Sequence, residues 1–322
     1  MAIKNESQLV LDYRSKTDIP QYVKEIIEAR LAIEAEDAKS AGALGFMSRA
    51  LVIATMPYKD PKADAFVRRN GDFTLRIVAG YEGGIPFGIY PRLLMSWVAT
   101  EAVRTESPVI ELGDSLSAFM RDVLELRGRS GGARGSVTRV NEQMRRLFGS
   151  MVTAQFNGTQ DKRGFNLRNV LIAEEYEEEA LDPDQLWTPQ EMEQAGQWRS
   201  KVRLTNKFYQ ECVTNPVPID LRAYKALRKS PLAMDVYTWL SYRMSYTQRK
   251  SRPIPWESLQ MQFGSGYAFD AQGKRDFKKS FLSALGLVQI VYPEAKFQIP
   301  DNGLVLLPSP PHIPHDRQKT FW

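Results

Sequence analysis

The chain carries one order of segments twice, at a nearly constant separation along the sequence. An apolar helix with a central tryptophan is expected at Pro91–Arg104 and again at Ala233–Arg243, with Trp97 and Trp239 lying 142 residues apart. Similarity at a fixed long offset indicates a duplicated structural unit, which strongly restricts the folds that the chain can adopt. The first prediction is therefore two copies of one module.

The segments after each tryptophan helix predict the kind of module. A short strand and a Ser-Leu helix start come next in each copy, at 109–116 and 254–259, and the Ser-Leu pairs are offset by 143 residues. Basic helices follow at about 135–148 and 274–285, and then apolar strands with a turn between them. Helix, helix, basic helix and two-stranded wing is the order of a winged helix-turn-helix, a module that reads DNA. We expect an α+β fold with two tandem winged helix-turn-helix domains.

The sequence also predicts domain boundaries. The expected order is an N-terminal helical extension at 1–44, the first winged helix at 45–172, an acidic linker at 173–198, the second winged helix at 199–310 and a C-terminal tail at 311–322. A chain of 322 residues has room for two domains of ordinary size.

Composition narrows the cellular setting. The only cysteine is Cys212, so an internal disulfide framework is excluded and a reducing compartment is favoured. The longest apolar runs, such as Leu304–Leu307, are far too short to span a bilayer, and the start of the chain has no apolar signal core. We expect a cytoplasmic protein with no membrane partner.

The net charge of +5 is unevenly divided. Residues 199–322 carry a net charge of +10 and residues 1–168 a net charge of +4, whereas nine acidic and no basic residues lie between Arg168 and Arg199. Two basic regions around an acidic connector suit a polyanionic partner. For the acidic run alone, the simpler interpretation is a solvated linker.

Local patterns predict the remaining elements. A helix is expected from Pro20 to Lys39 with Asp18 as its cap, and Pro231 with Ser230 as cap should open the Trp239 helix. Other helices are expected at 115–126, 199–212 and 221–229. Strands are expected at 51–56, 73–78, 151–156, 165–172, 217–220, 288–292, 297–299 and 304–307. The proline-rich segment 308–314 is expected to be extended.

The two basic helices supply the candidate DNA-binding residues. Each has an apolar stripe that can anchor in the domain and an opposite face with donors for phosphates and base edges. Arg139 and Arg146 are expected to face away from the first domain, and a glycine-rich loop leads into that helix. A charged stripe can also be only a solvated face, and basic residues near a hairpin tip can serve only solubility. The candidates are Arg134, Thr138, Arg139, Arg145, Arg146, Lys162, Arg163, Arg168, Lys274, Arg275, Lys278 and Lys279.

Catalytic patterns are missing. The only histidines, His312 and His315, lie in the proline-rich tail, so no Ser-His-Asp triad is expected in a folded region. No Gly-x-x-x-x-Gly-Lys-Ser/Thr phosphate loop occurs, and the Asp182–Asp184 pair lies in the acidic linker without further ligands. Cys212 has no histidine partner and is read as structural. We expect neither an enzyme nor a bound cofactor or metal.

Four segments resemble a known family. They are Gly88–Thr105, Ile110–Met120, Arg139–Phe148 and Pro218–Arg228, and they resemble the plasmid-encoded RepA-type replication initiators of Gram-negative bacteria. The resemblance covers about residues 45 to 310, and the chain is more remotely similar to the tandem winged-helix initiators of iteron plasmids.

The resemblance implies a function and partners. These are binding of directly repeated origin DNA, origin opening, and recruitment of host replication proteins such as a helicase, its loader or an origin-recognition initiator. It also implies monomer–dimer exchange with control of copy number, and that the second winged helix reads the repeat. The alternative is a plasmid-encoded transcriptional repressor that uses the same two modules on an operator. The resemblance favours the initiator.

Overall fold

The computed structural model describes residues 19–112, 119–124, 135–156, 166–177, 201–264 and 266–314. They divide into two compact units. Among the described residues, unit 1 comprises 19–58, 68–71 and 217–314, and unit 2 comprises 59–67 and 72–216. The units thus differ from the expected domain boundaries, because the N-terminal segment packs with the C-terminal half of the chain and residues 201–216 pack with the first half.

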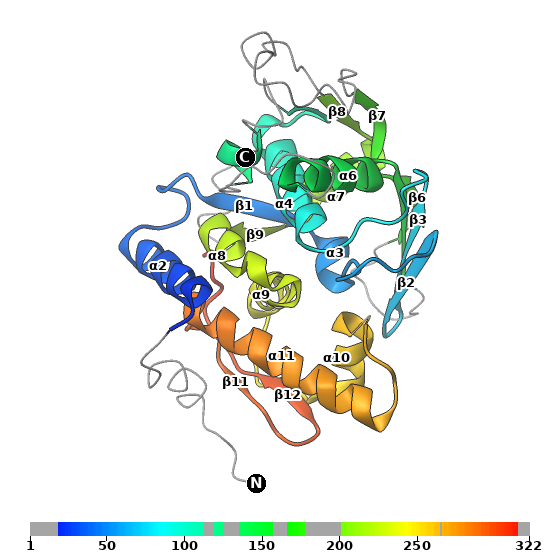
Figure 1. The fold of residues 1–322 in the computed structure, drawn as a ribbon. Helices are drawn as coiled ribbons and strands as arrows, with labels where there is room; N and C mark the ends of the chain where they lie inside the picture. Colours follow the sequence, from blue (N-terminus) through cyan, green and yellow to red (C-terminus); the bar gives the residue numbers. More distant parts are fainter. Residues whose placement is uncertain are drawn as a thin grey trace. The chain divides into compact units, whose positions relative to one another are not determined.

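Unit 1 is built mainly of helices (Figure 1). Its helices are α2 (Gln21–Ala35), α3 (Arg49–Ile53), α8 (Leu221–Ala226), α9 (Pro231–Met244), α10 (Trp256–Phe263) and α11 (Ala271–Val291), with a 3-10 turn at Leu227–Lys229. Strand β1 (Leu44–Ser48) pairs with β9 (Pro216–Asp220). A second sheet has the order β10 (Ile254–Pro255), β12 (Gly303–Leu306), β11 (Phe297–Gln298), so the hairpin β11–β12 pairs with the strand that precedes α10.

The core of unit 1 is aromatic. Trp239 on α9 meets Phe263 on α10 edge to face at 5.6 Å, and Phe263 packs against Phe281 on α11 at 5.5 Å. Buried side chains recur along α11 at helical spacing, from Phe277 and Phe281 to Leu285 and beyond. This apolar stripe explains why one helix of 21 residues forms here.

Unit 2 combines two sheets with three helices in its described part. One sheet has the order β2 (Ala65–Asn70), β3 (Phe73–Ala79), β5 (Ser150–Phe156), β6 (Asn166–Leu171), and the last three residues of β2 are counted in unit 1. A second sheet has the order β4 (Val109–Glu111), β8 (Lys201–Leu204), β7 (Ala173–Glu177). The helices are α4 (Ile89–Thr105), α6 (Ser136–Phe148) and α7 (Asn206–Thr214), with a π-helical turn at Phe119–Val123. Trp97 on α4 meets Phe119 of that turn edge to face at 4.7 Å.

The mixture of helices and small sheets is confirmed, as are most expected elements. The hairpin β5–β6, helix α6, strand β9 and the capping of α9 by Ser230, which accepts from Ala233 N at 3.2 Å, lie where the patterns placed them. The expected cap Asp18, half of the expected 115–126 helix and the tip of the β5–β6 hairpin fall outside the described residues.

Two expected strands are helices instead. Residues 49–53 form α3 and residues 288–291 are the last turn of α11. Both segments are short apolar runs with β-branched residues, a composition that does not distinguish a buried strand from a buried helix. Packing of α11 against α9 and α2 overrides the strand preference of Val288, Ile290 and Val291.

Two segments expected to be a helix and a linker form strands instead. Residues 201–204 were expected to be helical, yet their exposure alternates and they form β8 between β4 and β7. Residues 173–177 at the start of the expected acidic linker form β7. Thr205 then begins α7, because its hydroxyl accepts from Phe208 N at 3.2 Å. None of the helices in the part of the chain that the structure describes is long and apolar enough to cross a membrane.

Candidate nucleic-acid interface

The first turns of α11 present basic side chains at the surface of unit 1. Asp270 caps the helix by accepting from Gly273 N at 2.7 Å, and Phe277 and Phe281 anchor the inner face. With that face fixed, Lys274, Arg275, Lys278 and Lys279 remain partly or fully accessible. These residues lie on the basic helix expected from the sequence, and the structure brings all four to one end of it.

Two of these residues contact side chains of α10. Lys274 Nζ lies 2.9 Å from Glu257 Oε1, and Lys278 Nζ lies 4.7 Å from the centre of the Trp256 ring. The hydrogen bond from Lys274 lowers the pKa of Glu257 below its usual range. Both ammonium groups therefore already interact with the protein, although Lys274 keeps 41% of its side-chain surface exposed.

The other two residues form an outer stripe. Arg275 and Lys279 are exposed, four residues apart on one face of α11. Arg275 Nη2 donates to Gln272 Oε1 at 2.8 Å, and Gln272 Nε2 donates to Asp276 Oδ1 at 2.9 Å. Each contact joins residues three or four positions apart on the exposed face of α11, so it orders the stripe. The guanidinium of Arg275 has further N–H groups that can donate to a ligand.

The β11–β12 hairpin is fixed to the start of α10. Trp256 Nε1 donates to the carbonyl of Asp301 at 2.9 Å, which holds the hairpin turn beside the α10 residues that meet Lys274 and Lys278. The exposed side chains of the turn are Asp301 and Asn302. The turn of the β11–β12 hairpin therefore adds no cation to the basic end of α11.

Unit 2 presents a smaller basic surface on α6. Thr138 and Arg139 are exposed in the first turn, and Arg145 is half-buried. The expected outward orientation of Arg146 is wrong, because only 13% of its side-chain surface is exposed. Its Nε donates to Glu142 Oε1 at 2.8 Å, an Nη lies 3.5 Å from Asp60 Oδ2, and the guanidinium lies over the Phe87 ring.

Of the remaining four candidates, one lies on a described strand. Arg134, Lys162 and Arg163 lie outside the described residues, and Arg168 is on β6 with only its strand described. Their roles stay predictions.

Sequence reasoning missed a second basic surface on unit 1. Arg249, Lys250 and Arg252 are exposed in the segment between α9 and β10. Ser251 N donates to the Leu306 carbonyl and Ser251 Oγ accepts from Leu306 N, at 2.9 Å each. This basic segment therefore lies at the end of β12 away from the hairpin turn. The run of three cations within four residues was the available signal.

A buried polar network fixes α2, which packs against α8 and α11 (Figure 1). The Asp220 carboxylate, which is 1% exposed, accepts from Arg222 Nε at 3.0 Å and from Arg222 Nη2 at 2.7 Å. The same guanidinium donates to the carbonyls of Ala32 and Glu36, at 2.9 Å each, at the end of α2. Arg222 therefore ties α2, and through it the back of α11, to α8.

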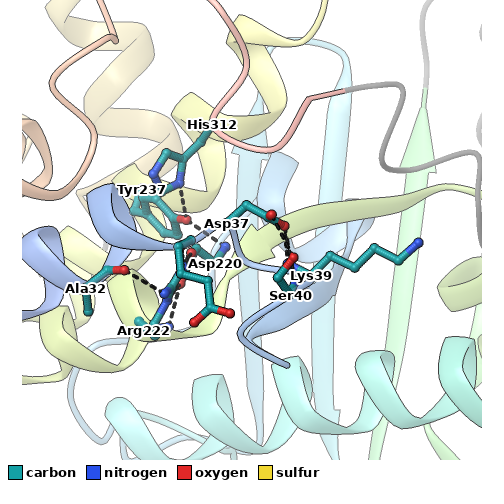
Figure 2. A network of polar contacts seen from close by, with 9 residues as sticks. Ala32, Asp37, Lys39, Ser40, Asp220, Arg222, Tyr237 and His312 are labelled. Atoms are coloured by element: carbon teal, nitrogen blue, oxygen red, sulfur yellow. Dashed lines mark hydrogen bonds and ion pairs between the residues drawn. The ribbon is translucent and has the colours of Figure 1, made fainter.

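The C-terminal segment joins this network (Figure 2). The Tyr237 hydroxyl accepts from Asp220 N at 2.9 Å and lies 2.7 Å from His312 Nδ1. His312 also packs on the Tyr292 ring at 4.6 Å, and the Tyr292 hydroxyl donates to the carbonyl of Pro310 at 2.6 Å. Burial lowers the pKa of His312 below its usual value. The expectation that both histidines lie outside the folded region is therefore wrong for His312, because two aromatic rings and one hydroxyl hold it.

Cys212 is fully buried in unit 2. Burial raises the pKa of its thiol far above the usual range, so a thiolate does not form near neutral pH. This agrees with the structural role expected from the sequence.

The geometry defines a mixed α/β protein whose unit 1 offers a helix with a basic, accessible first half beside a short hairpin. The chain belongs to the family described as plasmid encoded RepA protein, RepA_C, whose model matches residues 85–257, more than half of the chain. No curated protein sequence matches it. The crystal structure of selenomethionine derivatives of domain 2 and domain 3 of RctB is similar, with 13% identity and a TM-score of 0.44, covering 73% of this chain and 82% of that one. A likeness of this size carries no inference about function.

Proposed function

We propose that the chain is a plasmid replication initiator that binds directly repeated origin DNA through unit 1. In this proposal α9, β10, α10, α11 and the β11–β12 hairpin form a winged helix-turn-helix, with α11 as the helix that enters the major groove. Origin opening, recruitment of host replication proteins and monomer–dimer exchange belong to the same proposal. The protein acts without enzymatic chemistry of its own.

One observation carries the proposal. Strand β10, before α10, pairs with β12, the second strand of the hairpin. Helix α11 presents Arg275 and Lys279 outward, while its apolar face is fixed in the core. A helix can read a groove only when one face is anchored and the other supplies donors for bases and phosphates. Membership in the plasmid RepA family supports the same reading.

We assign different roles to the basic residues. Arg275, with a planar guanidinium on the outer stripe, contacts a base edge, and Lys279 contacts a phosphate. Lys274 and Lys278 contribute charge near the backbone while resting on α10. On α6, Thr138 and Arg139 contact phosphate, and Arg145 adds positive charge behind them.

We propose that unit 2 holds a diverged copy of the module. The packing of a tryptophan against a phenylalanine of the following helical segment recurs, as Trp97 with Phe119 and as Trp239 with Phe263. The sheets differ, because β4 pairs with β8, whereas the hairpin β5–β6 continues the sheet of β2 and β3. Unit 2 therefore offers less of the reading face and more sheet surface, which suits contact between copies of the chain.

Binding of the full chain to a duplex carrying the plasmid's origin repeats tests the DNA assignment. Arg275→Ala should bind about 5- to 150-fold more weakly and lose base preference at one position. Lys279→Ala should weaken all sequences alike and reduce the slope of log affinity against log salt by about 0.9. The matched control is Lys229→Ala, which removes one exposed charge of unit 1 from the 3-10 turn, outside the α10–α11 face.

Equal affinity and base preference in Arg275→Ala, Lys279→Ala and Lys229→Ala would remove α11 from the DNA. A replication test separates initiator from repressor. A replicon carrying this gene and its flanking repeats should propagate, and it should fail with Arg275→Ala. Specific binding without propagation would instead show a repressor.

A further inference from the structure

Phe269 is an exposed aromatic residue at the basic end of α11. It lies in the turn between α10 and α11, and 64% of its surface is exposed. The other large exposed hydrophobic residues of the described chain are Leu31 on α2, Val67 on β2 and Tyr246 just after α9. A phenylalanine exposed beside basic side chains can add apolar contact area to a ligand that these side chains bind.

The turn that carries Phe269 is fixed from both sides. The carbonyl of Ala268 accepts from Gln260 Nε2 of α10 at 2.8 Å, and the Tyr267 ring packs on Phe277 of α11 at 5.8 Å. Gly273 lies so close to this turn that an added Cβ would be 2.0 Å from the Ala268 carbonyl oxygen. The Tyr267 ring and the Ala268 carbonyl before Phe269 are thus held by α11 and α10, and Asp270 after it is held as the cap of α11. The outward position of Phe269 follows from these contacts.

The basic residues near Phe269 favour, as its ligand, a polyanion that also carries an apolar group. Gln272 follows three residues later, and Arg275 lies one helical turn beyond Gln272, linked to it by a hydrogen bond of 2.8 Å. Lys279 continues the stripe. An apolar protein partner would have to desolvate these cations, whereas DNA neutralises them. In the major groove, the C5-methyl group of thymine is the apolar group that a base edge offers.

We propose that Phe269 contacts the C5-methyl group of a thymine in the major groove, next to the base contacted by Arg275. This inference rests on the proposed role of α11 in reading DNA and extends it, because it makes Phe269 a specificity-determining residue for thymine. The contact adds no hydrogen bond. It discriminates by burying one methyl group against the ring.

The test uses a duplex that the full chain selects from a random library. Each thymine of the selected site is replaced in turn by uracil, which removes the methyl group and keeps base pairing. For the unmodified chain, one position should weaken binding by about 4-fold, the value for burying one methyl group. With Phe269→Ala, the same replacement should have no effect. Tyr246→Ala, which removes a 38% exposed aromatic residue outside the α10–α11 turn, is the control and should keep the 4-fold effect.

The outcomes separate the two proposals. If the full chain selects a site but no thymine position responds to uracil, or if Phe269→Ala responds as the unmodified chain does, the thymine contact is wrong while DNA reading stands. If Phe269→Ala keeps the uracil response but changes the sedimentation of the free protein, Phe269 serves contact between copies and the inference fails. If the full chain selects no sequence at all, the proposed function itself fails.

Discussion

Replacing Tyr237 by phenylalanine isolates one oxygen at the centre of the network that joins α8, α9 and the C-terminal segment. The ring is fully buried and packs against Tyr224 at 6.4 Å and His312 at 5.4 Å between ring centres. Phenylalanine keeps this packing. The variant loses only the hydroxyl, which accepts from Asp220 N at 2.9 Å and lies 2.7 Å from His312 Nδ1.

The expected cost follows from the two partners that remain. The Asp220 N–H is buried and donates to the Tyr237 hydroxyl. His312 Nδ1 is buried between aromatic rings. A buried group left without a partner costs about 1–3 kcal/mol, and removing the hydroxyl recovers part of its own desolvation. We expect Tyr237→Phe to lower the free energy of unfolding by about 2–4 kcal/mol.

Urea unfolding followed by circular dichroism measures this difference. Tyr246→Phe removes a hydroxyl from a residue that is 38% exposed, and it should change stability by less than about 0.5 kcal/mol. A loss below about 1 kcal/mol in Tyr237→Phe would refute the reasoning, because it would show that both partners find other hydrogen bonds.

Three further outcomes follow from burial and charge. The pKa of His312 is lower in the folded chain than the unfolded value of about 6.5, so unfolding takes up a proton below that pH. The free energy of unfolding should therefore fall as the pH drops from 7.5 to 5.5. In His312→Gln, the urea concentration at the unfolding midpoint should depend less on pH. Arg139→Ala should reduce the salt slope of DNA binding by about 0.9, whereas Arg146→Ala should lower the melting temperature, since its cation interacts with Glu142 and Asp60; equal salt slopes for Arg139→Ala and the unmodified chain would remove α6 from the DNA. Cys212 should react with a thiol reagent at pH 8 only after unfolding in urea, and rapid labelling of the folded chain would contradict its burial.

The elements with a clear period could be predicted from the sequence. The amphipathic pattern of α6 and the first half of α11 placed both basic helices correctly, and the two β-rich runs at 151–156 and 165–172 placed the strands β5 and β6. The last turn of α11 could not be predicted, because Val288–Val291 has the composition of a strand and only its packing in the core makes it a helix. The alternation of Lys201–Leu204 was a readable strand signal that the helical expectation overlooked.

The candidate site was predictable in outline only. Charge pattern identified Arg275 and Lys279, because a basic stripe opposite an apolar one can be counted along the sequence. It could not show that Arg146 is enclosed by Glu142, Asp60 and Phe87, since Asp60 and Phe87 are far away in the sequence. The exposure of Phe269 was equally hidden, because an apolar residue in a sequence is assigned to the core unless its neighbours are known.

Glu257 gives the last prediction, because it lies at the basic end of α11 with its carboxylate 2.9 Å from Lys274 Nζ. If α11 binds DNA as proposed, this carboxylate opposes a DNA phosphate in two ways. It repels the phosphate directly, and it holds the cation that would neutralise it. The side chain is 54% exposed, so the ion pair itself adds little to stability. Glu257→Gln keeps the shape of the side chain and removes its negative charge, so Lys274 is no longer neutralised by an ion pair. We expect it to tighten DNA binding several-fold and to steepen the salt slope. Glu257→Gln combined with Lys274→Ala should lose that gain. Weaker binding by Glu257→Gln alone would show the opposite, that the carboxylate positions Lys274 for its phosphate.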